Sequence, residues 1–177
     1  MNPTEWTIFG ILTLSNIWLS WWLSLKHKRY HGIFRLIAFE CIILLVICQY
    51  PVWFRDPFTW YQSISWILLA GSLLVAIFGF QLFYKHGQPE DQMEETTHLI
   101  KTGLYRYIRH PLYLSLILGG FGIMMKDPEW PQIIMSLINF IAMYLTGRVE
   151  EVEMIRKFGK EYASYMKETK MFFPYIL

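Results

Sequence analysis

Cysteine and charged residues are both scarce in this sequence. Two of its 177 residues are cysteine and 17% are Asp, Glu, Lys or Arg, whereas 54% are hydrophobic. Cys41 and Cys48 lie within one apolar block, separated by about 10 Å along a helix, too far apart to form a disulfide with each other. They are therefore interpreted as buried packing residues. The mean hydropathy of +0.29 excludes an ordinary soluble domain and indicates a membrane protein.

Five apolar blocks predict membrane-spanning helices, at residues 6–25, 33–54, 60–84, 112–125 and 133–145. The first three reach the length of about 20 residues that a helix needs to cross a bilayer, whereas the last two are short. Between the short blocks, "KDPEWP" contains Pro128 and Pro131, which prevent one continuous helix. We therefore predict an all-α, polytopic integral membrane protein with about five transmembrane helices. The last two would form a C-terminal helical hairpin, residues 109–125 and 130–149.

The basic residues are divided unequally between the two predicted sides of the membrane. Thirteen follow the first, third and fifth blocks, and two, Arg55 and Lys126, lie on the opposite side. The positive-inside rule then places the N-terminus outside and the C-terminus in the cytoplasm. The basic face is expected to meet anionic membrane lipids and not nucleic acid.

The stretch "TGLYRYIRHPLYLS", residues 102–115, concentrates polar and aromatic groups at the start of the fourth block. Pro111 suits the first turn of a helix because it has no N–H to donate. A helix N-terminus at the membrane surface presents free N–H groups to an anionic ligand, and His110 and Tyr113 would share one face there. The competing interpretation is that the Arg and Tyr side chains are ordinary interfacial anchors.

Two carboxylates, Glu150 and Glu151, follow the fifth block on the same predicted side as His110. They either contribute to a site there, or form a solvated helix face or ion pairs with Arg106 or Arg109. Apolar and aromatic residues then recur at helical spacing, at positions 152, 155, 158, 162 and 165. This pattern predicts an amphipathic helix that lies at the membrane interface and covers the site.

Two motifs together resemble the isoprenylcysteine carboxyl methyltransferase family of integral membrane enzymes. They are "HLIKTGLYRYIRHPLY" at residues 98–113 and "EEVEMIRKFGKEYASYMKETKMFFP" at residues 150–174, and the pair is more specific than either motif alone. The chain is similar to the compact prokaryotic-type members, which have a five-span core. The resemblance implies S-adenosylmethionine as cofactor, held between the loop before the fourth span and the end of the hairpin.

The resemblance also implies roles for individual residues. Those implied to bind the cofactor are Thr97, His98, Leu99, Ile100, Tyr105, His110, Pro111, Leu112, Tyr113 and Glu150. Those implied to act in catalysis are Arg109, Arg148, Glu150 and Glu151. Residues 1–84 would supply three N-terminal spans, and residues 85–177 would supply the catalytic region with its cofactor loop, hairpin and cytoplasmic helix, all within one domain. The implied reaction is carboxyl methylation of a lipid-like or prenylcysteine-like acceptor that enters from the bilayer.

The chain departs from this family where the acceptor would be held. Thr146 stands where prenylcysteine enzymes usually carry an Arg one helical turn before the first Glu, and such an Arg could grip a carboxylate with two hydrogen bonds. Arg148, Arg106 and Arg109 are the alternative clamps. The acceptor and the oligomeric state therefore stay open.

Two other classes of function share some of these features. NADPH-dependent sterol-type membrane reductases resemble this chain around the Arg-His-Pro-x-Tyr motif but have more spans, and a non-catalytic membrane scaffold would leave the paired motifs unexplained. Glu40, about 10 Å inside the second block, either lines an acceptor tunnel or is a structural carboxylate. His27 and His31 share a helix face without a carboxylate or thiolate, so we expect an interfacial anchor and no metal site.

Overall fold

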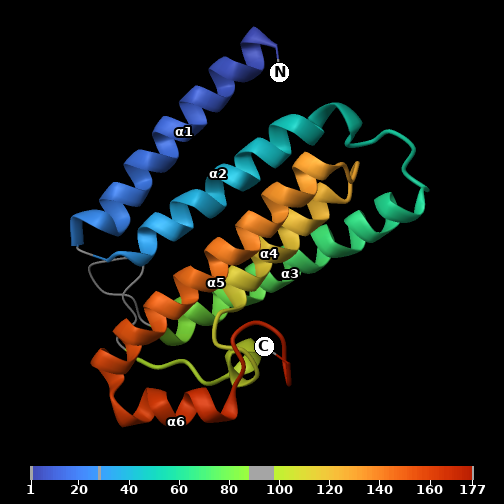
Figure 1. The fold of residues 1–177 in the computed structure, drawn as a ribbon. Helices are drawn as coiled ribbons and strands as arrows, with labels where there is room; N and C mark the ends of the chain where they lie inside the picture. Colours follow the sequence, from blue (N-terminus) through green and yellow to red (C-terminus); the bar gives the residue numbers. More distant parts are fainter. Residues whose placement is uncertain (1, 28, 88–97, 177) are drawn as a thin grey trace.

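The computed structural model of the protein describes residues 2–27, 29–87 and 98–176, and within these ranges every regular element is helical (Figure 1). The α-helices are α1 (Pro3–Leu23), α2 (His31–Gln49), α3 (Trp60–Gly87), α4 (Pro111–Met124), α5 (Trp130–Phe158) and α6 (Lys160–Glu168). Short 3₁₀ helices lie in the connections: η1 (Leu25–His27), η2 (Tyr50–Val52) and η3 (Gly103–Arg106). The predicted all-α class is confirmed.

Among the described residues, four helices are long and apolar enough to span a membrane, and a fifth apolar helix is shorter. Pro3–His27, His31–Val52, Trp60–Gly87 and Trp130–Phe158 are each long and apolar enough to cross a bilayer. The apolar helix α4 has 14 residues, a length of about 21 Å at 1.5 Å per residue. It pairs with α5 as the predicted hairpin, and each arm carries a proline in its first turn, where no backbone hydrogen bond is lost. The chain is therefore an integral membrane protein.

The helix α5 extends past the end of its apolar run. The sequence predicts an arm that ends at residue 149, but the helix continues to Phe158, and Glu150 and Glu151 lie within it. The backbone turns at Gly159, which has a φ of 56° that glycine adopts at little cost. The expected amphipathic helix is therefore divided, with buried Tyr162 and Tyr165 on the separate helix α6. A helix ends where its backbone hydrogen bonding is interrupted, and here that point lies beyond the end of the continuous apolar run.

Close approaches between small and polar residues hold the bundle together. The helix α3 packs along α4, and α2 packs along α5. A Cβ atom added at Gly120 of α4 would lie 2.7 Å from Asn139 Oδ1 of α5, and Asn139 Nδ2 donates to the Ala38 carbonyl of α2 at 3.2 Å. Because lipid tails remove the hydrophobic drive for helix association, such packing and hydrogen bonds supply much of it in a bilayer.

Glu40 connects α2 to α1. Its two carboxylate oxygens accept hydrogen bonds from Thr13 Oγ1 at 2.9 Å and from Asn16 Nδ2 at 2.8 Å. The helix α1 makes most of its interhelical contacts with α2. These bonds support the structural interpretation of Glu40, because both oxygens are used in holding α1.

Lys126 fixes the turn between α4 and α5. Its side chain is among the most deeply buried of the molecule, with Nζ 3.3 Å from the ring centroid of Trp66 and 5.3 Å from that of Trp53. Nζ also donates to Gln62 Oε1 at 3.1 Å. Burial lowers the pKa of Lys126 to about 8, whereas the faces of the two indole rings favour the cation. This cage anchors the end of the hairpin opposite to His110.

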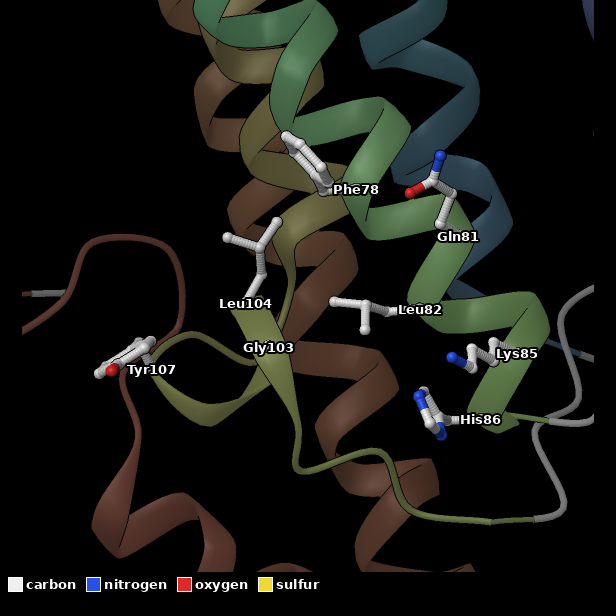
Figure 2. Close-up of a pocket in the computed structure, with 8 residues that line it drawn as sticks. All are labelled: Phe78, Gln81, Leu82, Lys85, His86, Gly103, Leu104 and Tyr107. Atoms are coloured by element: carbon white, nitrogen blue, oxygen red, sulfur yellow. The ribbon is translucent and has the colours of Figure 1, made fainter.

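The segment before α4 packs against the end of α3 (Figure 2). Gly103 has a φ of 59°, and a Cβ atom there would lie 2.6 Å from Leu82 Cδ1. Both the left-handed backbone and the close approach therefore require glycine. This contact positions η3, which leads directly to Arg109 and His110.

Candidate functional site

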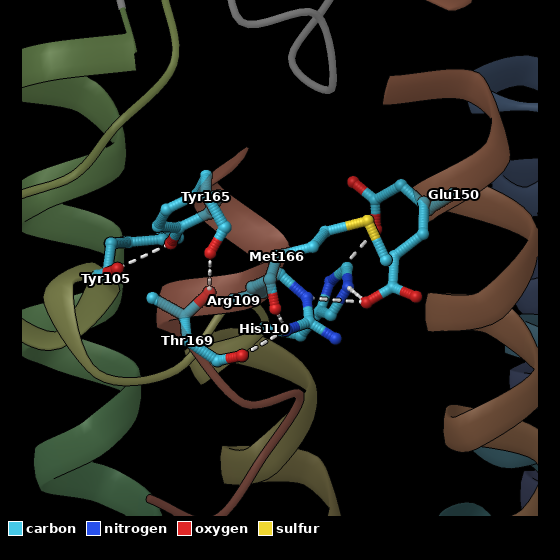
Figure 3. Close-up of polar contacts among 8 residues, drawn as sticks. Tyr105, Arg109, His110, Glu150, Tyr165, Met166 and Thr169 are labelled. Carbon is cyan, nitrogen blue, oxygen red and sulfur yellow. Dashed lines mark hydrogen bonds and ion pairs between the residues drawn. The ribbon is translucent and has the colours of Figure 1, made fainter. Parts of the chain in front are cut away.

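His110 lies at the centre of a buried polar cluster where α4 begins and α5 leaves the bundle (Figure 3). Its Nδ1 is 3.4 Å from Glu150 Oε2, and its Nε2 is 3.6 Å from Glu151 Oε1. The imidazole stacks on the ring of Tyr113, with centroids 5.2 Å apart and an interplanar angle of 8°. The structure thus joins the two sequence motifs at one point.

The charge state of His110 follows from its surroundings. Burial alone would lower its pKa, but the facing carboxylates of Glu150 and Glu151 raise it above its ordinary value. Gly147 of α5 lies directly beside the ring: a Cβ atom there would lie 3.4 Å from His110 Cδ2 and 3.3 Å from Met171 Cε. The cluster therefore favours an imidazolium enclosed by carboxylates.

Two atoms of the cluster lie near an oppositely charged group, at 3.4 and 3.6 Å, without a well-formed hydrogen bond. His110 Nε2 and Glu150 Oε2 are buried, and neither makes a hydrogen bond within the described part of the chain. Most buried polar atoms in proteins do have a partner, and leaving one without costs about 1–3 kcal/mol. The pair therefore has the capacity to bind a polar ligand.

Arg109 holds three elements together. Its Nε donates to Glu151 Oε1 at 2.6 Å, and the two side chains are 9% and 3% exposed. Its Nη1 also donates to the carbonyl oxygens of Thr169 and Met166 at the end of α6. With these bonds made, the guanidinium is occupied in positioning α5 and the C-terminal segment.

The C-terminal segment completes the cluster through its backbone. Arg109 N donates to the Lys170 carbonyl at 2.8 Å, and His110 N donates to the Met171 carbonyl at 3.1 Å. Lys170 N returns a bond to the Tyr107 carbonyl at 3.2 Å. The N–H groups of residues 109 and 110 are therefore used by the tail, and an anionic ligand at the start of α4 would have to use the N–H groups of the residues after Pro111.

Tyrosines of α6 close the other side of the cluster. Tyr105 is buried, and its carbonyl accepts a short hydrogen bond from the Tyr165 hydroxyl. Burial raises the pKa of Tyr105, Tyr162 and Tyr165, so these hydroxyls remain protonated donors. The aromatic positions that predict an amphipathic helix thus cover the polar cluster.

The remaining predicted site residues differ in burial and in their position relative to the cluster. Ile100 and Pro111 are buried, Leu99 and Leu112 are half-buried, and His98 is exposed. Thr97 lies outside the described residues. Arg148 is exposed on α5, whereas Thr146 is fully buried and its hydroxyl donates to the Ala142 carbonyl. The structure therefore joins Tyr105, Arg109, His110, Tyr113, Glu150 and Glu151, and leaves Arg148 apart.

Sequence reasoning missed a second histidine–carboxylate pair beside the first. Buried His31, at the start of α2, has Nδ1 3.3 Å from Glu153 Oε2. Glu153 lies three residues after Glu150, so both carboxylates share one face of α5. That spacing was the available signal, but the partner on α2 is 122 positions away. Among the described residues, no group of three or more His, Cys, Asp or Glu side chains could hold a metal ion.

A protein-family model described as phospholipid methyltransferase matches residues 60–161 of this chain. The matched stretch runs from the first residue of α3 to the first turn of α6. It therefore contains η3, α4 and the part of α5 that carries Glu150 and Glu151, and it covers more than half of the chain.

Individual relatives are similar at low identity. Methanethiol S-methyltransferase 1 of Bradyrhizobium diazoefficiens is 27% identical over 114 residues, which are 63% of this chain and 39% of that protein. Methanethiol S-methyltransferase of Crocosphaera subtropica is 22% identical over 175 residues, with 89% and 66% covered. Protein-S-isoprenylcysteine O-methyltransferase of Rattus norvegicus is 27% identical over 130 residues, with 65% and 44% covered. The chain thus spans less than two thirds of the length of each.

Proposed function

Because the chain belongs to the phospholipid methyltransferase family, we propose that it is a membrane methyltransferase that takes its methyl group from S-adenosylmethionine. The observation that carries this proposal is the pair of buried His110 and half-buried Glu150. Their nitrogen and oxygen face each other at 3.4 Å, while His110 Nε2 and Glu150 Oε2 have no hydrogen-bond partner in the described ranges. A polar ligand that reaches both atoms would remove the cost of leaving them unpaired.

The chemistry of the cluster fits S-adenosylmethionine. This molecule carries a sulfonium, an ammonium, a carboxylate, ribose hydroxyls and an adenine. The Glu150 carboxylate can attract a cation or accept from a hydroxyl, and His110 and Tyr113 can bind polar groups. NADPH fits less well, because its phosphates would face two carboxylates while Arg109 is already bound to Glu151.

The residues of the chain would contribute placement and exclusion of water. When bound, S-adenosylmethionine supplies a methyl group that its sulfonium already activates. Arg109 and Glu151 would hold the C-terminal segment and α6 over the site, and the tyrosines of α6 would shield it from water. A carboxylate acceptor is ionised near pH 7, so its methylation depends on positioning and desolvation.

We propose a lipophilic acceptor that reaches the cluster from the bilayer, with a carboxylate as its methylated group. The resemblance to prenylcysteine enzymes supports the carboxylate, although Thr146 cannot clamp it. A thiol is the second candidate acceptor, because two relatives are named methanethiol S-methyltransferases. A thiol also needs no arginine to hold it by two hydrogen bonds. A free carboxylate would instead need a cation, for which exposed Arg148 is the candidate.

The test is transfer of radiolabelled methyl groups from S-adenosylmethionine by the purified protein in lipid nanodiscs. Parallel samples contain an S-farnesylcysteine derivative, a long-chain alkanethiol or extracted membrane lipids. Alkali releases volatile methanol from a methyl ester but not from a thioether, so one treatment distinguishes the two candidate reactions. We expect alkali-labile label on the prenylcysteine acceptor.

Matched variants connect the activity to the cluster. Glu150→Gln and His110→Gln are expected to abolish transfer, while Glu161→Gln, on the exposed face of α6, keeps it. Arg148→Ala is expected to raise KM for the carboxylate acceptor if Arg148 serves as the clamp. NADPH oxidation without methyl transfer would contradict the proposal in favour of a reductase, and neither activity would favour a scaffold.

A further inference from the structure

A groove of about 520 Å³ lies outside the polar cluster, between the end of α3 and η3 (Figure 2). Phe78 and Leu82 of α3 and Leu104 of η3 form its apolar part, and Lys85, His86 and Tyr107 supply its polar groups. Phe78 and Tyr107 are each 52% exposed. The groove therefore opens to the outside of the helix bundle, where α3 meets lipid.

The groove is distinct from the cluster around His110. The short helix η3 separates the two, because its consecutive side chains point in different directions. Tyr105 is buried, and its carbonyl accepts from Tyr165 of α6, whereas Leu104 and Tyr107 line the groove beside α3. A ligand in the groove would contact the opposite face of the same segment.

The groove combines apolar and cationic groups in the order that an amphiphile requires. Phe78 lies seven residues before Lys85 on α3, which is about 10 Å along the helix axis. Lys85 and His86 lie in the last turn of this membrane-spanning helix, so the apolar end of the groove is deeper in the bilayer than the charged end. Lys85 forms no ion pair with another described residue.

A snorkelling lysine at a helix end is common by itself. Here, however, η3 forms a second side of the groove, because Gly103 allows η3 to pack closely against Leu82 of α3. A molecule in the groove would therefore bridge α3 and η3.

We infer that the groove binds an anionic phospholipid of the surrounding bilayer. An acyl chain lies along Phe78, Leu82 and Leu104, and the phosphate lies beside Lys85 and His86. This site does not depend on the methyltransferase chemistry, and its lipid is a bound ligand and not the methyl acceptor. Because η3 leads into Arg109 and His110, the bound lipid also stabilises the segment that carries the polar cluster.

Native mass spectrometry of the delipidated full-length protein tests the inference. Dioleoyl phosphatidylglycerol and dioleoyl phosphatidylcholine have the same chains, so they separate the effect of net headgroup charge from that of the acyl groups. We expect tighter binding of phosphatidylglycerol, and a loss of about fivefold in that preference for Lys85→Gln, the effect of one basic residue at a membrane surface. Phe78→Ser is expected to weaken the binding of both lipids equally.

Lys101→Gln is the matched control, because Lys101 is an exposed lysine near η3 that is paired with Glu161 and does not line the groove. A photoreactive acyl chain on phosphatidylglycerol is expected to cross-link within residues 78–86 or 103–107. Equal binding of the two lipids, an equal effect of the two lysine variants, or cross-links only elsewhere would overturn the inference. Oleate that binds as tightly as phosphatidylglycerol, or competition by inorganic phosphate alone, would overturn the assignment to a phospholipid.

Discussion

Replacing Arg109 with alanine is expected to destabilise the protein strongly. The substitution removes one half of a buried ion pair whose side chains are 9% and 3% exposed, together with the bonds to the Thr169 and Met166 carbonyls. The Glu151 carboxylate stays buried without its closest cation, and such truncations cost about 3–5 kcal/mol. Each kcal/mol lowers the Tm of a chain of this size by about 2–4 °C, so we expect a decrease of roughly 6–20 °C. Tryptophan fluorescence during heating in detergent measures it.

Two further variants separate the buried charge from general damage. Lys101→Ala removes an ion pair whose side chains are 44% and 60% exposed, and it is expected to cost less than about 1 kcal/mol. The double variant Arg109→Met/Glu151→Leu removes both charges while keeping volume, so it should unfold at a higher temperature than Arg109→Ala. Equal stability of Arg109→Ala and Lys101→Ala, or a double variant that is the least stable of the three, would contradict this expectation.

Three other predictions concern His110, Lys126 and Gly103. A histidine whose pKa rises on folding adds stability below its unfolded pKa of about 6.5 and loses it as pH rises through the folded pKa. The Tm of the wild type should therefore fall with rising pH above about 6.5, and less so in His110→Gln. Lys126→Ala should lower the free energy of unfolding by about 2 kcal/mol, because it removes the cation from the face of the Trp66 ring. An unchanged denaturant midpoint in chemical unfolding would contradict this. Gly103→Ala should speed proteolysis of the segment before α4, at a cost of about 1–3 kcal/mol, and Leu82→Ala should partly restore resistance by making space.

The spans and the hairpin could be predicted because they depend on local properties. Apolar length identifies a membrane helix, and Pro111 and the "KDPEWP" segment mark helix starts and the turn between them. The end of α5 could not be predicted from apolar content, since the helix continues through charged residues to Phe158. The predicted orientation of the termini and the single-domain organisation stay predictions.

The meeting of His110 with Glu150 and Glu151 could be predicted only through the resemblance between motifs, and membership of a methyltransferase family confirms that resemblance. An ion pair of Arg109 with Glu151 was one of the alternatives that the sequence left open, and the structure contains it. The bonds of Arg109 to the Thr169 and Met166 carbonyls could not be predicted, because these residues lie 60 and 57 positions away. The pairing of the tail with residues 107–110 is likewise a tertiary contact without a local signal. The implied catalytic roles of Arg148 and of the cluster residues stay predictions.

The most direct test of the proposed site is calorimetric titration of the detergent-solubilised protein with S-adenosylhomocysteine, with NADPH in a parallel experiment. We expect S-adenosylhomocysteine to bind and NADPH not to bind. Glu150→Gln and His110→Gln should lose this binding while Glu161→Gln retains it, because only the first two lie in the buried cluster. Binding of NADPH alone, or unchanged binding of S-adenosylhomocysteine by both cluster variants, would contradict the assignment of the site.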